Sequence, residues 1–206
     1  MSRTRIKICG ITSPELATIA CTAGADAIGL MFFNPSSRHL EIEQARAIRH
    51  CVTPYVTSVA VMVNPDVDYV RAIISQVGVG QLQFHGEEDN AFCESFGLPY
   101  VKALRVAEDT DLKAAERKYP GCSGILLDTH LPGLYGGSGK TFDWNKARFG
   151  AEKPLILAGG LVAENVAEAI RTTRPYGVDV SSGVETDGIK DPVRIRQFCA
   201  NARNSI

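Results

Sequence analysis

Two short segments of the chain place reactive side chains at the ends of predicted strands. In the segment RIKIC, strand alternation puts Lys7 and Cys9 on one face and the two isoleucines on the other. A lysine beside a cysteine favours the thiolate, which is both a base and a nucleophile. In the segment SGILLD, Asp128 is the last residue and shares a face with Leu126. A thiol and a carboxyl group that face one another across a single site form a candidate acid–base pair.

Each of these side chains also has a structural interpretation, and the residues alone leave the alternatives open. Cys9 could be a small buried hydrophobic residue, which is the commoner role of a free cysteine. Lys7 could contact a substrate phosphate or have a structural role. Asp128 could cap a helix or form hydrogen bonds with the loop that follows it.

Two glycine-rich segments near the C-terminus predict an anion site. LAGGL and DVSSGVE place small residues at the ends of predicted strands. The backbone N–H groups of such residues can approach a ligand closely. The helical turns after them favour phosphate at their positive ends. Two such segments favour a phosphorylated substrate, with these candidate phosphate-binding residues: Gly159, Gly160, Ser181, Ser182 and Gly183.

Arg38 and His85 are further candidates in loops after predicted strands. Arg38, in the segment FFNPSSRHL, could hold a substrate carboxylate through two hydrogen bonds, although a single loop arginine is usually solvated. His85 follows Gln81 and Gln83 on one face of QLQFHGEED. It could contact a ligand or cap the next helix, and the sequence favours neither.

The segment GLYGGSGKT resembles a nucleotide-binding phosphate loop only superficially. The motif requires a glycine five positions before Gly139, where this chain has Leu134, and Gly133 lies one residue out of register. The motif also follows a strand directly, whereas here residues 129–141 form a long connection after Asp128. We therefore expect no ATP binding and interpret the segment as a loop.

The elements that position these residues alternate regularly along the chain. Eight β-rich segments are each followed by a helical pattern, at about 26 residues per unit, which predicts an α/β protein with a single (β/α)8 TIM barrel over residues 1–206. A doubly wound open sheet is the competing architecture, but no G-x-G-x-x-G follows the first strand. In barrels the active site lies at the carboxyl ends of the strands. The predicted strands are residues 5–9, 27–32, 55–63, 79–84, 100–105, 123–128, 154–159 and 177–182.

Three helix starts are marked by a capping residue followed by proline. After the second, apolar residues recur at helical spacing and predict one buried stripe. The starts are Ser13-Pro14, Asn64-Pro65 and Asp191-Pro192, and the stripe is Val67, Val70, Ile74 and Val77.

Composition excludes several classes of function. The chain is 45% hydrophobic and 22% charged with a formal net charge of -1, which is typical of an ordinary globular protein and gives no attraction to nucleic acid or membrane. The N-terminus has no apolar segment of a signal peptide, so we expect a cytoplasmic location. The six cysteines form no C-x-x-C pair and the four histidines have no ligand spacing, so neither a metal site nor a disulfide framework is expected.

Several segments together resemble one family. KICGI, DAIGLMF with SSRHL, VGVGQLQFHGEE, LLDT followed by GGSGKTFDW, LAGGLVAENV and GVDVSSGVE occur in the order found in the phosphoribosylanthranilate isomerase family of tryptophan biosynthesis. The resemblance covers nearly the whole chain. It implies a phosphate-binding barrel that uses no cofactor and converts N-(5′-phosphoribosyl)anthranilate to 1-(2-carboxyphenylamino)-1-deoxyribulose 5-phosphate, an Amadori rearrangement.

The resemblance also implies roles for individual residues. Asp128 would be the general acid that protonates the ring oxygen, and Cys9 the general base that removes the proton from C2. Arg38 would hold the anthranilate carboxylate, and Asp179 would lie near the sugar hydroxyls. The phosphate would bind at Gly160, Ser182 and Gly183. Lys7 and His85 are further candidates for substrate contact, and the GGSGKT loop would cover the sugar, with the role of Lys140 left open.

The chain departs from the family pattern near Arg38, because Ser37 stands where the family usually has proline. QFHG replaces the usual QLHG on an apolar face, which we expect to be harmless. Three alternatives remain: an aminoimidazole carboxamide ribotide isomerase of histidine biosynthesis, a barrel with both activities, and a non-catalytic barrel that binds a phosphorylated metabolite. The sequence allows either a monomer or a homodimer.

Overall fold

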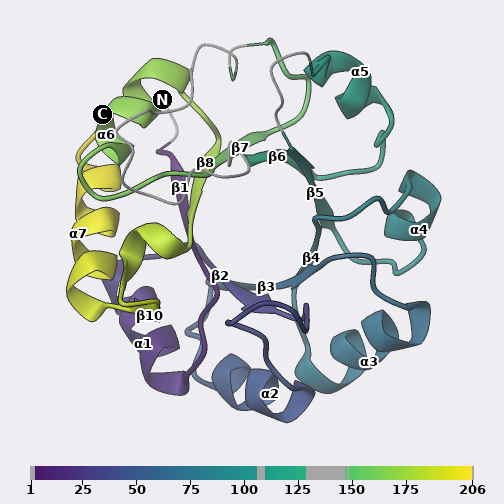
Figure 1. Cartoon of the computed structure of the whole chain (residues 1–206), viewed down its shortest axis with the longest axis horizontal. Helices are drawn as coiled ribbons and strands as arrows, with labels where there is room; N and C mark the ends of the chain where they lie inside the picture. The colour runs from purple at the N-terminus through teal and green to yellow at the C-terminus, as the bar shows by residue number, and fades with distance from the viewer. Residues whose placement is uncertain (1–2, 106–109, 129–146, 148, 206) are drawn as a thin grey trace.

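A closed barrel of eight parallel strands forms the centre of the molecule, which is described here by a computed structural model (Figure 1). The structure describes residues 3–105, 110–128, 147 and 149–205. The strands follow one another around the barrel in chain order, and β8 pairs with β1 to close it. The predicted TIM barrel is therefore confirmed. The strands are β1 (Arg5–Cys9), β2 (Ala27–Met31), β3 (Thr57–Met62), β4 (Gln81–Phe84), β5 (Tyr100–Arg105), β6 (Gly124–Asp128), β7 (Leu155–Ala158) and β8 (Gly177–Val180).

The helices surround the barrel as an outer ring (Figure 1). Part of the connection between β6 and β7 lies outside the described residues, as does the GGSGKT segment with Lys140. The helices are α1 (Pro14–Ala23), α2 (Ile42–His50), α3 (Val67–Val77), α4 (Asn90–Glu94), α5 (Leu112–Arg117), α6 (Val166–Thr173) and α7 (Pro192–Arg203).

Strand alternation divides the apolar residues between two environments. Outward-facing residues such as Ile6 and Ile8 join the helices in one large core, because aliphatic side chains fill the layer between sheet and helices. Inward-facing residues form separate clusters. One consists of Cys9, Val59 and Val61, and the other includes Leu126 and Ala158. Cys9 therefore lies inside the barrel, as alternation predicts.

Two of the three predicted helix starts are confirmed, and one is wrong. Ser13 caps α1 by accepting a hydrogen bond from the Leu16 backbone, and Asp191 caps α7. Asn64, in contrast, does not cap α3, which begins at Val67 after Asp66. The side chain of Asn64 instead accepts a hydrogen bond from the Glu87 backbone at 2.7 Å. Tertiary contact between two loops thus replaces the local cap that the sequence pattern indicates.

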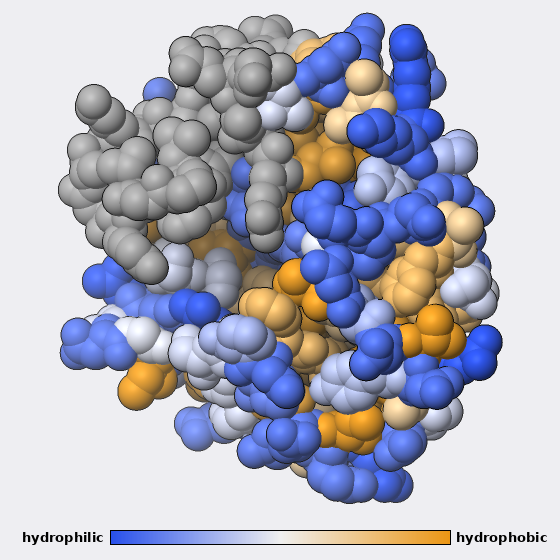
Figure 2. All heavy atoms as spheres, turned by 45° about the vertical axis from the view of Figure 1, so that its right-hand side comes forward, coloured by the Kyte–Doolittle hydropathy of each residue, from blue (hydrophilic) through white to orange (hydrophobic). Residues whose placement is uncertain are grey.

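The apolar stripe of α3 is confirmed except at its first residue. Val70, Ile73 and Val77 are buried and Ile74 packs against the core, whereas Val67 at the first position is exposed. On the face shown in Figure 2, the described residues are mostly hydrophilic, with apolar residues in small separate groups. None of the described helices is long and apolar enough to cross a membrane. The cytoplasmic location stays a prediction.

After β8 the chain forms a short structure that the sequence does not predict. A 3-10 helix, η2 (Ser182–Val184), leads into a two-stranded antiparallel hairpin of β9 (Glu185–Thr186) and β10 (Ile189–Lys190). The hairpin pairs Glu185 with Lys190 and precedes α7. It lies on the side of the barrel formed by β1 and β2 (Figure 1).

Candidate active site

A buried ion pair joins the first and last strands of the barrel. Lys7 and Asp179 are register partners on β1 and β8, and Lys7 Nζ lies 2.9 Å from Asp179 Oδ2. Only 9% of the lysine side chain and 7% of the aspartate side chain are exposed. The other carboxylate oxygen, Asp179 Oδ1, is buried and has no hydrogen-bond partner among the described residues. A buried acceptor of this kind is costly unless a ligand or water satisfies it, so Asp179 is suited to bind a hydroxyl group.

Cys9 lies beside this pair, in space that a glycine provides. Gly29 on β2 is the register partner of Cys9. A methyl group on Gly29 would lie only 2.7 Å from Cys9 Sγ and 3.2 Å from Lys7 Nζ. The absence of a side chain at Gly29 therefore allows the thiol and the ammonium group to approach one another.

The ionisation of Cys9 reflects opposing influences. Burial has the largest effect and raises the pKa of the thiol, and the negative charge of Asp179 raises it further. The positive charges of Lys7 and Lys190 lower the pKa but do not outweigh burial, so the pKa of Cys9 lies above its ordinary value. For Lys7, burial lowers the pKa of the ammonium group, but Asp179 and Cys9 together outweigh burial and raise it. Lys7 is therefore charged near neutral pH. Its charge does not compensate for the burial of Cys9, so the thiol is favoured over the thiolate.

Asp128 ends β6 on the inward face of the barrel. It lies two positions after Leu126, which belongs to an inward cluster, and it pairs in register with Ala158 of β7. Strands β7 and β8 separate it from β1 around the barrel. The side chain is half-buried and interacts with its surroundings. Cys9 and Asp128 thus both lie at the carboxyl end of the barrel and on its inner face.

The two predicted phosphate-binding loops pack directly on one another. Gly183 has no room for a side chain, because a methyl group there would overlap the carbonyl oxygen of Leu161. In the loop after β7, Gly160 has a positive φ of 64°, and its carbonyl accepts a hydrogen bond from Asn165 Nδ2 at 3.0 Å. Gly160 and Ser182 are exposed, so their backbone groups are accessible to a ligand.

Arg38 is held in a fixed orientation. Its Nε and Nη2 donate to the two carboxylate oxygens of Glu185, both at 2.6 Å. Glu185 also accepts a hydrogen bond from the buried Lys190. Burial raises the pKa of Glu185, but the hydrogen bonds from Arg38 and Lys190 outweigh this and hold the pKa below its ordinary value. Burial lowers the pKa of Lys190. The hydrogen bond with Glu185 opposes this effect without outweighing it, so the pKa stays below its ordinary value. Arg38 is therefore a partly buried member of a charged cluster and not a solvated arginine.

His85 follows β4 and does not cap the next helix. Asp89 caps α4 by accepting a hydrogen bond from the Phe92 backbone at 2.7 Å, so the capping alternative for His85 is wrong. The ring nitrogen Nε2 of His85 contacts the side-chain amide of Gln83, which is buried. His85 is directed along the same strand face as Gln83.

A second buried ion pair holds the loop that follows His85. Lys102 Nζ on β5 lies 2.6 Å from Glu88 Oε2 and donates to the Gly86 carbonyl at 2.7 Å. The other oxygen of Glu88 accepts a hydrogen bond from the Asn64 backbone at 2.7 Å. The pair connects the loops after β3 and β4 to β5.

Four of these residues are not among the candidates that the sequence provides: Gly29, Glu88, Glu185 and Lys190. Gly29 carries a sequence signal, because an isolated glycine within a strand indicates a close approach of neighbouring groups. Glu185 ends a recognised segment and Lys190 lies five residues beyond it, but their partner Arg38 is 147 residues away from Glu185 in sequence. In the part of the chain that the structure describes, no group of three or more His, Cys, Asp or Glu side chains is arranged to hold a metal ion.

Comparison with known proteins gives a consistent result. The family model of N-(5′-phosphoribosyl)anthranilate isomerase matches residues 6–201. An N-(5′-phosphoribosyl)anthranilate isomerase from Pseudomonas fluorescens strain Pf-5 is 50% identical over 206 residues, covering 100% of this chain and 98% of that protein. One from Cellvibrio japonicus is 48% identical over 199 residues, covering 96% and 93%.

Solved structures of the same kind are also similar. The crystal structure of phosphoribosyl anthranilate isomerase from Thermotoga maritima has a TM-score of 0.88 and 41% identity, covering 97% of this chain and 98% of that one. A second crystal structure, of the isomerase in complex with reduced 1-(o-carboxyphenylamino)-1-deoxyribulose 5-phosphate, has a TM-score of 0.81 and 37% identity, with the same coverage. A third describes monomers generated from the dimeric T. maritima enzyme, with a TM-score of 0.82 and 38% identity, again with the same coverage.

Proposed function

Because the chain belongs to the N-(5′-phosphoribosyl)anthranilate isomerase family, we propose that Cys9 and Asp128 divide the proton transfers of its reaction between them. The chain is an isomerase of tryptophan biosynthesis. It converts N-(5′-phosphoribosyl)anthranilate to 1-(2-carboxyphenylamino)-1-deoxyribulose 5-phosphate by an Amadori rearrangement, an aldose–ketose isomerisation. The observation that carries the proposal is the position of both side chains on the inner face at the carboxyl end of the barrel.

In the first step Asp128 is the acid. It donates a proton to the ring oxygen of the furanose, the bond between C1 and that oxygen breaks, and the nitrogen lone pair forms an iminium ion with C1. The ring oxygen leaves as a hydroxyl group on C4. General acid catalysis of this kind contributes about 10²–10⁴-fold to the rate.

In the second step Cys9 is the base. It removes the proton from C2, and the electron pair of the broken C–H bond forms the C1–C2 double bond while the iminium nitrogen becomes neutral. The resulting enolamine tautomerises to the ketone. The iminium cation acidifies the C–H bond, so this step needs no cofactor. A cation in the same buried space also favours the thiolate, and it opposes the effect of burial on the pKa of Cys9.

The remaining predicted residues position the substrate. Arg38 holds the anthranilate carboxylate, and Asp179 Oδ1, which has no partner among the described residues, accepts a hydrogen bond from a sugar hydroxyl. Lys7 fixes Asp179 through its other oxygen. His85 lies within the same end of the barrel and contacts the sugar or the aromatic ring. The loops after β7 and β8 bind the phosphate through these residues: Gly159, Gly160, Ser181, Ser182 and Gly183.

The test is turnover of freshly prepared phosphoribosylanthranilate, followed by the loss of its anthranilate fluorescence. We expect Cys9→Ala and Asp128→Asn each to lower kcat by about 10²–10⁴-fold, with the product analogue still bound. Matched controls are the exposed Cys51→Ser and Asp68→Asn, which should retain full activity. If either active-site variant keeps wild-type kcat, that residue does not transfer the proton. The histidine-pathway ribotide, tested beside the natural substrate, examines the dual-activity alternative.

A further inference from the structure

The hairpin after β8 carries an ion pair that continues to Arg38. Arg38 Nε and Nη2 contact Glu185 in a two-point arrangement, which is the strongest and most directional form of a carboxylate–guanidinium pair. The side chain of Glu185 is only 5% exposed and that of Arg38 is 24% exposed. One end of this pair is therefore buried in the protein, and the other is closer to solvent.

Lys190 completes the group from the opposite strand of the hairpin. Its side chain is 2% exposed, and its ammonium group donates to Glu185, to the Ser181 carbonyl at 3.2 Å and to Ser181 Oγ at 3.3 Å. The three charged groups sum to one net positive charge. Without Lys190, the pair of Arg38 and Glu185 would be neutral and would attract an anion weakly.

The contacts with Glu185 leave one nitrogen of the Arg38 guanidinium group unused, and the side chain lies next to the residue after Cys9. Among the described residues, Nη1 has no acceptor, although a guanidinium group has five N–H donors. The aliphatic part of the side chain crosses Gly10, the residue after Cys9, because a methyl group on Gly10 would lie 2.5 Å from Arg38 Cδ and 3.3 Å from Ser181 Oγ. Arg38 thus passes between the catalytic strand and the predicted phosphate loop.

We propose that Glu185 and Lys190 are positioning residues that prepare Arg38 for the carboxylate of the substrate. Glu185 occupies the Nε and Nη2 edge of the guanidinium group, so that Nη1 faces the substrate. Lys190 cancels the charge of Glu185, so that the group keeps one positive charge for the incoming anion. This inference rests on the proposed role of Arg38 in the reaction.

The test compares the binding of two product analogues by calorimetry. The first is the reduced product, which has the carboxylate on its phenyl ring, and the second is the same molecule without the carboxylate. We expect Glu185→Gln to lower the affinity for the first analogue by about 10–100-fold and to change the affinity for the second by no more than about 2-fold. Arg38→Met should show the same selectivity. The double variant Arg38→Met with Glu185→Gln should lose little more affinity for the first analogue than Arg38→Met alone, since the two residues act as one unit.

The exposed pair of Glu43 and Arg46, 3.9 Å apart, provides the matched control. Glu43→Gln should change the affinity for neither analogue. In turnover assays, Glu185→Gln should raise KM more than it lowers kcat, and Glu185→Asp should recover part of the affinity. Lys190→Met leaves Glu185 buried without its second cation and should lower the stability of the fold. Because Lys190 also contacts Ser181 of the proposed phosphate loop, the selectivity between the analogues is tested at Glu185 and Arg38.

The outcomes separate this inference from the proposed function. If Glu185→Gln weakens both analogues equally, Glu185 has a general structural role and the inference is wrong. Tighter binding of the first analogue by Glu185→Gln would mean that Glu185 competes with the substrate for Arg38, which also overturns it. If the wild type binds both analogues equally, Arg38 does not hold the carboxylate, and the proposed role of Arg38 fails together with the inference.

Discussion

The two ends of the barrel contain the same kinds of ion pair in different surroundings. At the carboxyl end, Lys7 and Asp179 are almost completely buried, and one oxygen of Asp179 has no partner within the described ranges of the chain. At the amino end, Asp26 pairs with Arg3 and Arg5, whose side chains are 46% and 48% exposed. Both oxygens of Asp26 accept hydrogen bonds. Oδ1 accepts from Arg5, and Oδ2 accepts from Arg3 and from the Ile6 backbone at 2.9 Å.

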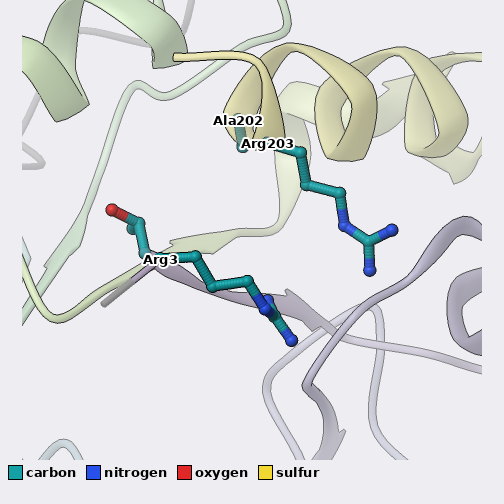
Figure 3. Close-up of a pocket in the computed structure, with 4 residues that line it drawn as sticks. Arg3, Ala202 and Arg203 are labelled. Carbon is teal, nitrogen blue, oxygen red and sulfur yellow. The ribbon is translucent and has the colours of Figure 1, made fainter. Parts of the chain in front are cut away.

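The arginines that line a cavity at the amino end also have hydrogen-bond partners within the protein. A cavity of about 310 Å³ is lined by Arg3, Thr4, Ala202 and Arg203 (Figure 3). Its two arginines are directed to the same side, where Arg3 binds Asp26 and Arg203 donates to the Gly24 carbonyl at 2.7 Å. The comparison indicates that a charged pair alone does not mark a functional site. An ion pair that is buried and still has an unused oxygen distinguishes the carboxyl end.

The largest expected effect follows from breaking the buried pair. Lys7→Met leaves the Asp179 carboxylate buried without its cation, which should lower the free energy of unfolding by about 3–5 kcal/mol. Replacing both residues, by Lys7→Met with Asp179→Leu, should recover most of this stability, because an apolar pair of similar volume is often neutral or stabilising. Turnover should stay lost in both variants. Urea unfolding and the fluorescence assay measure the two quantities.

That double variant is also the control for the first prediction. If the double variant is no more stable than Lys7→Met, the loss does not arise from an unpaired charge. If the double variant regains turnover, the pair belongs with the structural pairs of the amino end, and the distinction between the two ends is wrong.

A smaller effect is expected from filling the space beside Cys9. Gly29→Ala places a methyl group 2.7 Å from Cys9 Sγ and 3.1 Å from Cys9 Cα, so the thiol must move. We expect a loss of about 1–3 kcal/mol in stability from overpacking and of about 10²-fold in kcat from misplacement of the proposed base. The matched control is Gly80→Ala near the amino end of β4, where the nearest atom is Thr57 Cγ2 at 3.5 Å, an ordinary contact. Equal turnover of the two variants would contradict the role of Gly29.

The smallest effect is expected from the pair at the amino end. Burial raises the pKa of Asp26, but the hydrogen bonds from Arg3 and the Ile6 backbone outweigh it and hold the pKa below its ordinary value. Because the folded pKa is depressed, the stabilisation is present above the unfolded pKa and is lost as the pH falls through the folded pKa. Asp26→Asn should therefore cost about 1 kcal/mol at neutral pH and nothing once Asp26 is protonated in the wild type.

The measurement is urea unfolding of wild type and Asp26→Asn over a series of pH values down to about pH 3. Turnover of Asp26→Asn at neutral pH should equal that of the wild type. Reduced turnover in a folded Asp26→Asn protein would show that the amino end contributes to the reaction, and it would remove the contrast between the two ends.

The strands and the inward direction of Cys9 could be predicted from the sequence because both depend on local alternation. In β1 aliphatic side chains alternate with polar or reactive ones, and in both β1 and β6 the last residue of the strand points inward. The capping roles of Ser13 and Asp191 are local for the same reason. Local patterns therefore predict the barrel and the positions of its inward side chains.

The rest of the site depends on contacts between distant segments. Asn64 matches a cap in sequence, yet it has a positive φ of 45° and binds the loop after β4. The orientation of Arg38 depends on Glu185 from the far end of the chain, and no local pattern connects the two. The effect of Lys7 on Cys9 was predictable in direction only, because the opposing effect of burial requires the packed barrel.

The packing of Gly183 against the Leu161 carbonyl has a consequence for the thermodynamics of binding. Since the backbones of the two proposed phosphate loops are already in contact, they have little conformational entropy left to lose when a ligand arrives. The cost of ordering these loops is met when the chain folds. A larger side chain at position 183 would separate the loops and return that entropy to the binding step.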